Sequence, residues 1–586
     1  MTTDRLFDED VDVTEAVIRV LEGAGIDMVF GIPGGYTVKL FDALYDHTSS
    51  VRTVLVREES LAGVMAEVYG RLTGKPAVVM GQGAFLLSNA LLGTIEGHLA
   101  STPMLLLTDF TDGAPYSHHG PYQTGTGEWG AFDARRSFAG VTKETMVASD
   151  PAQAVQVTQL AVKHALTGEP GPVAVIYHGN ALNGAVGPKT RPALYPSAPY
   201  LPVVVGPAPE AAVEAAAQTM LVAERPVIVA GNGVRMSQAY GELEQLAVQL
   251  GAPVATTATG KGVMRETHGL ALGVIGNFGL PIANAVVGQA DVVIAVGTKL
   301  GATDTANEHP ALLDPRRQSF VQIDIEPRNA SWTFPVDHAL IGDAGPVLTQ
   351  LSEALAAAGG VSQSAHAERQ ALLNEARLEH VGFDGPEAES DAAPLLPQRI
   401  IKDIHNAIDD DAIITCDAGE NRIFMTHFFQ TKGSGTFIQP AAIGGMGYAI
   451  PGALAAKLVF PDRQAVAVCG DGGFAMGFNG LMSAVENDLP ITVVVFNNDA
   501  LGWVINSQGD RPFASEFERF DHAEIARAMR CDGVRVDEPN ELRTALSEAV
   551  ESGRPTVVDV YTSRETTYRE VTSPLAATAE YAEIAE

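Results

Sequence analysis

Two polar segments near the C-terminus have the residue types of a site for a cation and a phosphate. Gly470-Asp471-Gly472-Gly473 follows the apolar run from Gln464 to Cys469. Phe496-Asn497-Asn498 follows a second apolar run, from Ile491 to Val495, and both runs are typical of buried strands. A carboxylate and a carboxamide at adjacent strand ends can hold one hard cation, and glycines let the backbone approach a phosphate closely. The pattern therefore predicts a diphosphate clamp.

A pair of carboxylates near the N-terminus occupies a similar position. The strand-like run from Val51 to Val56 leads into Arg57-Glu58-Glu59, and a helix is predicted from Ser60 to Leu72. Ligands bind at the carboxyl ends of the strands in open parallel sheets, so this position indicates a functional carboxylate. The alternative is that acidic residues stand there only because they stabilise a helix N-terminus.

The elements that must position these residues alternate between strand and helix. A helix is predicted over residues 12–25, followed by a strand over 28–30 and a glycine-rich turn from Gly31 to Gly35. A further helix, from Met476 to Asn487, is expected between the two strands of the clamp. Alternation of this kind predicts parallel sheets with helices on both faces.

Two stretches divide the chain, which at 586 residues is too long for a single core. Gly184 to Pro209 is too rich in proline for a helix or an inner strand. From about Ala356 to Pro397, glycine pairs and an Ala-Ala-Pro segment flank a charged helical piece. We therefore expect three α/β domains with doubly wound parallel sheets, over residues 1–185, 206–356 and 395–586.

Composition and charge exclude several classes of partner. The net charge of −33 argues against binding to nucleic acid or to an anionic membrane. Cys416, Cys469 and Cys531 are widely separated and form neither a metal-binding pair nor an even disulfide framework. The N-terminus is acidic, and no run approaches the roughly 18 apolar residues of a membrane span. We expect a cytoplasmic protein.

Whole segments of the chain resemble the thiamine diphosphate (ThDP) enzymes of the acetolactate synthase group. The segment from Glu59 to Arg71 resembles the helix that carries the catalytic glutamate, and its Tyr69 and Arg71 select Glu59 rather than Glu58. The other matches are the turn Gly31-Ile32-Pro33-Gly34-Gly35, the turn Gly81-Gln82-Gly83-Ala84, Ser101-Thr102-Pro103, Pro121-Tyr122-Gln123, the loop from Gly444 to Pro451, and the two clamp segments. The resemblance covers nearly the whole chain and implies a pyrimidine-binding, a middle Rossmann-like and a diphosphate-binding domain.

The resemblance implies a role for each matched residue. Glu59 would hydrogen-bond the aminopyrimidine ring of ThDP and drive the imino tautomer that takes the proton from C2. Met446 would support the bend between the two rings, although core packing is an alternative. Gln123 matches an active-site glutamine. The residues expected to contact the cofactor are Gly34, Gly35, Gly83, Met446, Gly470, Gly472, Gly473 and Asn498.

A metal and a subunit arrangement are implied in the same way. Asp471 and Asn498 would bind Mg²⁺ through side-chain oxygens, and the backbone carbonyl of Ala500 would complete the protein ligands. In this family the catalytic glutamate and the metal ligands come from different subunits. The resemblance therefore implies a homodimer or homotetramer in which Glu59 faces the clamp of a partner chain.

The middle block has the weakest signal for a ligand. Strands are expected over 226–230, 291–296 and 320–325, and relatives hold FAD or the ADP part of coenzyme A in this domain. The segment from Gly297 to Thr305 lacks the arginine- and aspartate-rich pattern of the FAD-binding relatives. FAD and ADP are therefore not the favoured expectation.

Departures from the acetolactate synthase pattern leave the substrate open. Glu58 replaces the usual histidine, Phe85-Leu86 replaces a polar pair, and Glu420-Asn421 replaces a glutamine-histidine pair. His118-His119 stands where 2-keto acid decarboxylases carry paired histidines that handle protons, or else belongs to a polar loop. Trp503 indicates either an apolar wall near the reacting carbon or a core residue.

The resemblance implies a ThDP- and Mg²⁺-dependent carboligase or decarboxylase that acts on 2-keto acids through an enamine intermediate. The alternative within the class is a 2-hydroxyacyl-CoA lyase or an oxalyl-CoA decarboxylase-like enzyme with an acyl-CoA substrate. The alternative from another class is a non-catalytic scaffold or regulator with the ThDP fold. Such a scaffold has no need of Glu59, Asp471 and Asn498 together.

Overall fold

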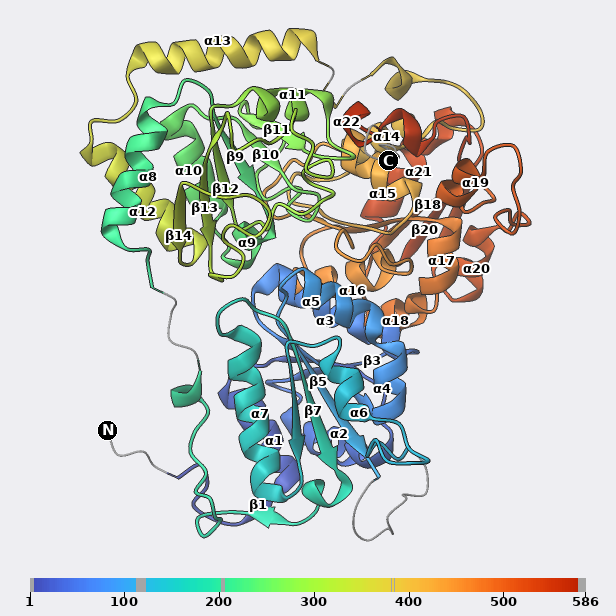
Figure 1. The fold of residues 1–586 in the computed structure, drawn as a ribbon. Helices are drawn as coiled ribbons and strands as arrows, with labels where there is room; N and C mark the ends of the chain where they lie inside the picture. The colour runs from blue at the N-terminus through green and yellow to red at the C-terminus, as the bar shows by residue number, and fades with distance from the viewer. Residues whose placement is uncertain (1–4, 112–122, 202–205, 381, 384, 578–586) are drawn as a thin grey trace. The chain divides into compact units, whose positions relative to one another are not determined.

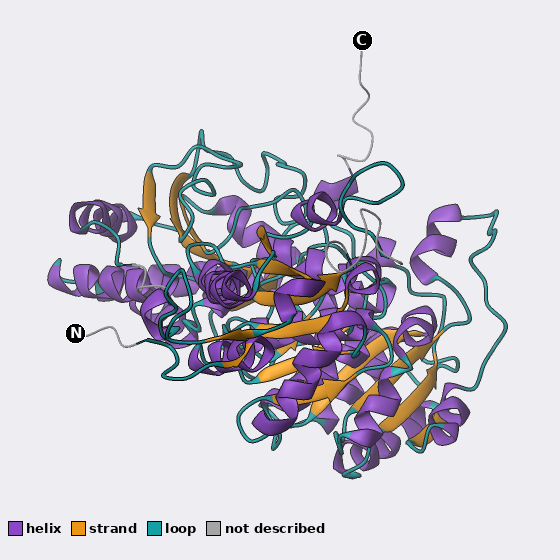
Figure 2. Ribbon diagram, turned by 90° about the horizontal axis from the view of Figure 1, so that it is seen from below, coloured by secondary structure: helices purple, strands orange, loops and turns teal. Residues whose placement is uncertain are grey.

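Two compact units make up the chain, one up to residue 204 and one from residue 205 onward. The computed structural model describes residues 5–111, 123–201, 206–380, 382–383 and 385–577, and the other residues appear as the grey trace in Figure 1. Three six-stranded parallel sheets form the framework, one in the first unit and two in the second. Helices lie on both sides of the strands (Figure 2).

The sheet of the first unit has the strand order β3-β2-β4-β5-β7-β6. Its strands are β2 (Met28–Gly31), β3 (Arg52–Leu55), β4 (Ala77–Gln82), β5 (Met104–Phe110), β6 (Glu144–Ala148) and β7 (Pro172–His178). Its helices are α1 (Val13–Gly23), α2 (Val38–Leu44), α3 (Glu59–Thr73), α4 (Gly83–Asn89), α5 (Leu91–Leu99), α6 (Ala134–Ala139) and α7 (Pro151–Leu166). The short strands β1 (Val11–Asp12) and β8 (Ala185–Val186) pair antiparallel beside it.

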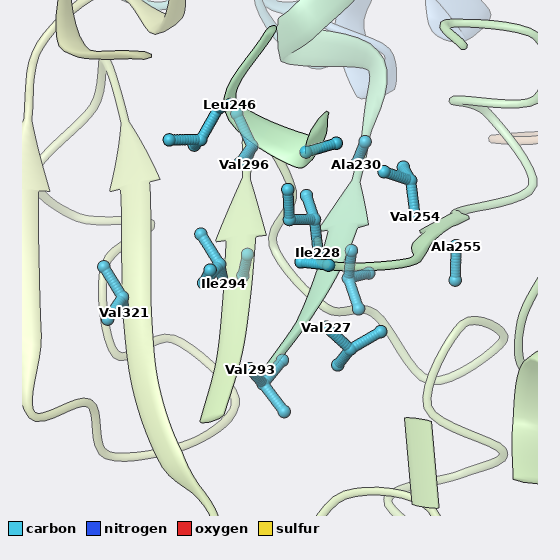
Figure 3. Close-up of a cluster of buried hydrophobic side chains, with 14 of the residues drawn as sticks. Val227, Ile228, Ala230, Leu246, Val254, Ala255, Val293, Ile294, Val296 and Val321 are labelled. Carbon is cyan, nitrogen blue, oxygen red and sulfur yellow. The ribbon is translucent and has the colours of Figure 1, made fainter. Parts of the chain in front are cut away.

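The middle sheet, in the second unit, has the order β11-β10-β9-β12-β13-β14. Its strands are β9 (Pro226–Ala230), β10 (Val254–Thr256), β11 (Ala271–Val274), β12 (Val292–Val296), β13 (Ser319–Asp324) and β14 (His338–Ile341). The helices around it are α8 (Glu210–Val222), α9 (Asn232–Met236), α10 (Tyr240–Leu250), α11 (Pro281–Gln289), α12 (Ala344–Ala357) and α13 (Gln363–Glu379). Its strands are apolar and buried, as Val227, Ile228 and Ile294 illustrate (Figure 3), which is typical of a sheet covered on both faces.

The third sheet has the order β16-β15-β17-β18-β20-β19. Its strands are β15 (Ile413–Cys416), β16 (Phe437–Ile438), β17 (Ala465–Gly470), β18 (Thr492–Asn497), β19 (Asp532–Val536) and β20 (Thr556–Tyr561). Its helices are α14 (Pro397–Ala407), α15 (Glu420–Phe428), α16 (Ala449–Val459), α17 (Asp471–Gly477), α18 (Gly480–Glu486), α19 (Gly502–Gln508), α20 (His522–Ala528), α21 (Pro539–Glu551) and α22 (Pro574–Ala577).

The expected fold class of three doubly wound parallel sheets is confirmed. The limits 1–185, 206–356 and 395–586 stay a prediction, and each of these ranges contains one of the sheets. The expected single helix from Met476 to Asn487 is wrong, because α17 begins at Asp471 and a break separates it from α18. Gly477, Asn479 and Gly480 surround the break and are poor helix formers. In the described part of the chain, no helix has the length and apolar character needed to cross a bilayer.

A buried lysine joins the middle sheet to the third sheet within the second unit. The Lys261 side chain is fully buried, and its Nζ donates to both carboxylate oxygens of Glu266, at 2.8 Å each, and to the carbonyl of Phe429 at 2.8 Å. The same ammonium lies 5.4 Å from the centre of the Phe437 ring. Glu266 in turn accepts from the backbone N–H of Thr431 at 2.9 Å. Removing one partner of such a pair leaves a buried, uncompensated charge.

Lys261→Met is expected to lower the stability of the second unit by about 3–5 kcal/mol, because it leaves the Glu266 carboxylate buried without its cation. The midpoint of thermal or urea unfolding of the full chain measures this loss. The control is Arg265→Gln, since the Arg265–Glu244 ion pair is partly exposed and its loss should cost less than about 1 kcal/mol. Equal losses of stability in the two variants would show that the Lys261–Glu266 pair contributes no more to folding than a surface ion pair.

Candidate cofactor-binding site

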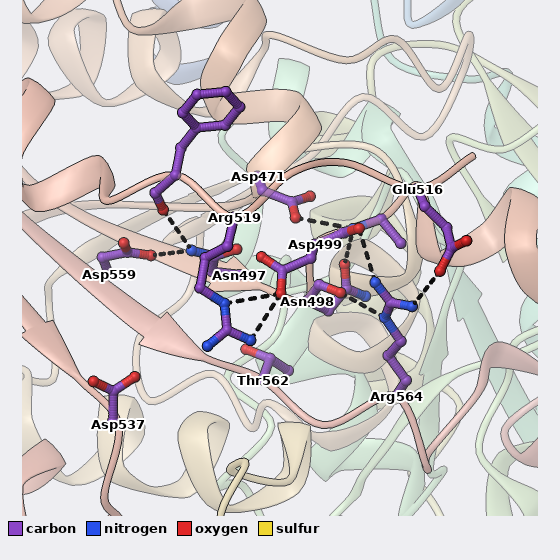
Figure 4. A network of polar contacts seen from close by, with 12 residues as sticks. Asp471, Asn497, Asn498, Asp499, Glu516, Arg519, Asp537, Asp559, Thr562 and Arg564 are labelled. Atoms are coloured by element: carbon purple, nitrogen blue, oxygen red, sulfur yellow. Dashed lines mark hydrogen bonds and ion pairs between the residues drawn. The ribbon is translucent and has the colours of Figure 1, made fainter. Parts of the chain in front are cut away.

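The two clamp segments meet at one edge of the third sheet. Asp471 is the first residue of α17, directly after β17, and Asn498 directly follows β18. β17 and β18 are neighbouring parallel strands, with Gly470 opposite Phe496. The Asp471 Oδ2 and Asn498 Oδ1 atoms accept from the same backbone N–H, that of Ala500, at 3.1 and 3.2 Å (Figure 4). The two side-chain oxygens expected to bind Mg²⁺ therefore converge.

The donor set of the clamp fits a hard cation. One carboxylate, one carboxamide and a nearby backbone carbonyl are oxygen donors of the kind that Mg²⁺ prefers. Burial raises the pKa of the Asp471 carboxyl to about 6, against hydrogen bonds from the Gly472 and Ala500 N–H groups. A cation at the clamp would favour the charged carboxylate. In the described residues, no group of three or more His, Cys, Asp and Glu side chains forms a metal site of another type.

Two arginines hold the turn after β18. The Asp499 backbone has φ 55°, a left-handed conformation, and its carboxylate oxygen Oδ2 accepts from Arg519 Nε and Nη2 at 2.9 and 2.8 Å. Arg564 donates to the carbonyls of Asn498 and Asp499 at 2.6 and 2.8 Å (Figure 4). Charge-assisted bonds of this kind stabilise a turn whose backbone is otherwise unfavourable. The sequence analysis did not identify these arginines, which lie in loops well after the strand.

The two asparagines of the second segment have different roles. The Asn497 side chain is buried, and its Nδ2 donates to the carbonyl of Phe520 at 3.2 Å and to Asp559 Oδ1 at 3.0 Å. These bonds tie β18 to β20 and to the segment before α20. The side-chain oxygen of Asn498 accepts from the same N–H as Asp471. Asn497 therefore has a structural role, and Asn498 is the candidate metal ligand.

A buried aspartate that the sequence analysis missed organises the loop of Met446. The Asp417 carboxylate accepts from the backbone N–H groups of Gly447, Tyr448 and Ala449 at 2.9, 2.9 and 3.0 Å. Burial raises its pKa to about 6 against these bonds. Asp417 directly follows β15, as Asp471 follows β17, and this repeated position was the available signal.

Glycines 472 and 473 allow close contacts at the start of α17. A Cβ on Gly472 would lie 2.8 Å from the Met446 methyl carbon, and one on Gly473 would lie 2.9 Å from Asp417 Cγ. Met446 therefore reaches the start of α17, and Asp417 lies between the loop of Met446 and α17. A Cβ on Gly470 would have its nearest neighbour at 3.6 Å, so steric crowding does not explain that glycine.

Glu59 lies at the carboxyl edge of the first unit's sheet. It is the first residue of α3 and 8% exposed, and its Oε2 accepts from Asn89 Nδ2 at 3.0 Å. A Cβ on Gly81, in β4, would lie 3.9 Å from Glu59 Cγ. The carboxylate therefore sits between the start of α3 and the second glycine turn, with one hydrogen bond from a carboxamide.

The two glycine turns of the first unit meet at Asp109. The Tyr36 N–H donates to Asp109 Oδ2 at 2.5 Å, and a Cβ on Gly35 would lie 2.4 Å from the same oxygen. A Cβ on Gly83 would lie 2.1 Å from the Asp109 carbonyl, so both glycines are required sterically. Gly34 is less crowded, since its Cβ would lie 3.1 Å from Gln82 Oε1. Burial raises the pKa of Asp109 to about 6, and the sequence analysis did not single this residue out.

Gln123 turns toward the second glycine turn. Its backbone has φ 54°, and its Oε1 accepts from the N–H of Ala84 at 3.3 Å. This places the side-chain amide at the N-terminus of α4. His118 and His119, together with the neighbouring Pro121 and Tyr122, lie outside the described residues.

Glu420, which departs from the acetolactate synthase pattern, and Trp503 lie close to the clamp. Glu420 is 6% exposed, and its Oε1 accepts from Asn506 Nδ2 at 2.7 Å and from the Tyr568 N–H at 3.0 Å. A Cβ on Gly502 would collide with Glu420 Oε2 and lie 3.0 Å from Asn498 Nδ2. Trp503 is partly exposed and stacks on Tyr568, with ring centres 4.1 Å apart and an angle of 7°. Burial raises the pKa of the Glu420 carboxyl.

The glycines of the middle sheet pack against one another. A Cβ on Gly231 would lie 2.4 Å from the Gly297 carbonyl, and one on Gly233 would lie 2.5 Å from Gly297 Cα. Backbone packing therefore accounts for these three glycines. The expectation that neither FAD nor ADP is a favoured ligand of this domain stays a prediction from the sequence.

Family profiles match three parts of the chain. The thiamine pyrophosphate enzyme N-terminal TPP binding domain matches residues 11–125, the central domain residues 213–351, and the C-terminal TPP binding domain residues 417–560. Thiamine pyrophosphate is the cofactor ThDP. Glu59 lies within the first match, and Asp417, Asp471 and Asn498 lie within the last.

Several curated relatives match over nearly the full chain. The probable acetolactate synthase large subunit of Methanocaldococcus jannaschii is 31% identical over 562 residues, covering 93% of this chain and 91% of the relative. The acetolactate synthase isozyme 3 large subunit of Escherichia coli is 30% identical, covering 92% of each chain. The sulfoacetaldehyde acetyltransferase of Alcaligenes xylosoxydans is 28% identical, covering 94% of this chain and 93% of the relative. The chain therefore belongs to the thiamine diphosphate-dependent enzymes, as an acetolactate synthase-like member of that family.

Proposed function

We propose that this enzyme uses ThDP and Mg²⁺ to form or break a carbon–carbon bond beside the carbonyl group of a 2-keto acid. The single observation that carries the proposal is the convergence of Asp471 Oδ2 and Asn498 Oδ1 on one N–H, that of Ala500 in the turn after β18. These two oxygens and the Ala500 carbonyl would hold the Mg²⁺ that neutralises the diphosphate. Bound ThDP supplies a stabilised carbanion next to a substrate carbonyl.

The residues of this chain would bind, orient and protect the cofactor. The glycine-rich start of α17 admits phosphate oxygens close to backbone N–H groups, which the helix dipole favours. Asp417 fixes the loop backbone that presents Met446 over Gly472. Glu59 would hydrogen-bond the pyrimidine nitrogen, since its carboxyl group is buried at the start of α3.

We further propose a homodimer as the smallest active form, possessing two sites, each with Glu59 from one chain and the clamp from the other. Glu59 belongs to the first compact unit and the clamp to the second. The family resemblance supports a partner chain as the source of one half. A homotetramer would contain the same pair twice.

Acetolactate synthases and a sulfoacetaldehyde acetyltransferase are among the relatives of this chain. We propose pyruvate or another 2-keto acid as the donor, with the acceptor left open by these names. Mass spectrometry of products after incubation with pyruvate, larger 2-keto acids, aldehydes, sulfoacetaldehyde and acyl-CoAs tests it. Turnover of a 2-keto acid supports the proposal. Turnover of acyl-CoAs alone, or of none of these compounds, would contradict it.

Glu59→Gln is expected to retain ThDP but to slow loss of the C2 proton from the bound cofactor by about a hundredfold or more, because the amide cannot hold the proton at the pyrimidine nitrogen. Hydrogen–deuterium exchange at C2, followed by NMR, measures this rate. Glu58→Gln, at the adjacent position, is the matched control and should exchange nearly as fast as the unchanged enzyme. Unaltered exchange in Glu59→Gln would remove the catalytic assignment.

Asp471→Ala is expected to abolish Mg²⁺-dependent retention of ThDP, because the clamp loses its carboxylate. Gel filtration followed by quantification of bound ThDP, with and without EDTA, measures retention. Asp462→Ala is the control, since Asp462 is exposed and lies before β17, at the opposite end of that strand from Asp471. Normal retention in Asp471→Ala would place the metal elsewhere.

Asp417→Ala is expected to weaken ThDP binding about tenfold or more, because three loop N–H groups lose a charged acceptor. Titration of ThDP at saturating Mg²⁺, followed by calorimetry, gives the dissociation constant. Asp532→Ala is a control with an exposed, surface-paired carboxylate and should bind ThDP normally. Unchanged affinity in Asp417→Ala would mean that the loop does not depend on this anchor.

A further inference from the structure

A cavity lies at the amino-terminal edge of the middle sheet, away from the carboxyl edge where ligands of this fold class usually bind. It has a volume of about 180 Å³ and lies between α13, the end of α11 and the residues that precede β9 and β10. An apolar cavity of about 150 Å³ is sufficient for benzene in another protein, so this one has room for a small organic molecule. Figure 1 shows α13 beside α11.

The cavity is lined by a buried arginine whose hydrogen bonds go to backbone carbonyls. Arg369 lines it and is 4% exposed. Its guanidinium donates to the backbone carbonyls of Leu250 and Ala223, the latter at 2.6 Å, and its Nε has no hydrogen-bond partner. Among the described residues, no carboxylate forms an ion pair with it. Only two of the five N–H groups of this side chain are therefore used.

A buried cation without a counter-ion is costly, and the surroundings compensate for this one only in part. Burial lowers the pKa of Arg369, and the charge of Asp291 opposes that shift. The Asp291 carboxylate oxygens are engaged by the backbone N–H groups of Glu224 and Arg225, at 2.6 and 2.9 Å. An anion in the cavity would supply the missing charge at short range.

The walls restrict the anion further. Apolar side chains form much of the lining, namely Pro226, Pro253, Val286, Leu372, Leu373 and Ala376. Glu224, Glu375 and Glu379 also line the cavity and are exposed, so they would repel a second negative charge. Arg225 and Gln289 add polar groups at the same edge. One carboxylate with an apolar tail matches this combination better than a phosphate or a dicarboxylate does, because the glutamates oppose each added negative charge.

We propose that this cavity binds a small aliphatic monocarboxylate, with its carboxylate on the Arg369 guanidinium and its tail against α11 and α13. The free acid and the amino acid of the same tail share this chemistry. The exposed glutamates could receive an ammonium group in the second case. The site does not depend on the proposed reaction, because none of the residues that line it belongs to the clamp.

The test is calorimetric titration of the full-length enzyme saturated with ThDP and Mg²⁺. The probes are 4-methylpentanoate, leucine, 3-methylbutylamine and inorganic phosphate. The first has a carboxylate and an apolar tail, leucine adds an ammonium group, the amine lacks the carboxylate, and phosphate is a multiply charged anion without a tail. Neither carboxylate probe is a 2-keto acid, so turnover does not interfere. Binding of 4-methylpentanoate or of leucine, with weaker or no binding of the amine and of phosphate, is expected.

Arg369→Gln should weaken binding about tenfold or more, because a charge-assisted pair becomes a neutral contact. Ala376→Phe should also abolish binding, by filling the cavity from a partly exposed position of α13, and it leaves the Arg369 bonds in place if the arginine variant fails to fold. Arg377→Gln is the matched control, since Arg377 is on the same helix and does not line the cavity. Absence of carboxylate binding, equal binding of the amine, or binding unchanged in Ala376→Phe would overturn the proposal.

Discussion

The parallel pairing of β17 with β18 is the constraint on which the candidate site depends. Their register brings the ends of two strands to one edge, so residues 27 positions apart in the chain, Asp471 and Asn498, share one N–H donor. A shift of the register by one residue would turn the side chains of one strand to the opposite face and separate these oxygens. The buried apolar residues of both strands fix that register, and thus the core of the third sheet determines the geometry of the clamp.

Buried aspartates at other strand ends complete this arrangement. Asp109 holds the two glycine turns of the first unit, and Asp417 holds the loop that carries Met446. Asp109 accepts from the Tyr36 N–H in a short 3-10 helix, and Asp417 accepts from N–H groups that lead into the first turn of α16. N–H groups at a helix start have no partner within the helix, so the carboxylates satisfy them. Carboxylates therefore anchor the backbone of segments around the candidate site, in addition to buried side chains such as Tyr448.

The sequence predicted the parts that depend on local pattern. Alternating apolar runs and helices indicated the parallel sheets, and the segments around Glu59, Asp471 and Asn498 indicated the family. The break between α17 and α18 was missed because the apolar spacing on both sides fits one helix. Asp109, Arg519 and Arg564 were missed for another reason: each acts on a segment distant in the chain, and a single sequence carries no signal for such pairing. Asp417 also acts on a distant segment, and its position directly after an apolar run was the one signal for it. The paired histidines, His118 and His119, remain a hypothesis from the sequence alone.

The burial of Asp417 has a consequence for the response of the fold to acid. Its pKa in the folded chain is about 6, above the ordinary value of 3.8, so the folded chain binds more protons than the unfolded chain between these values. Linkage then requires that the contribution of this group to folding stability be greatest in acid and decline as the solution is brought from pH 3.8 to 6. Near neutral pH the Asp417 carboxylate is thus ionised, and its ionisation lowers the free energy of unfolding. The fold tolerates a less favourable charge at this position in return for an ordered loop.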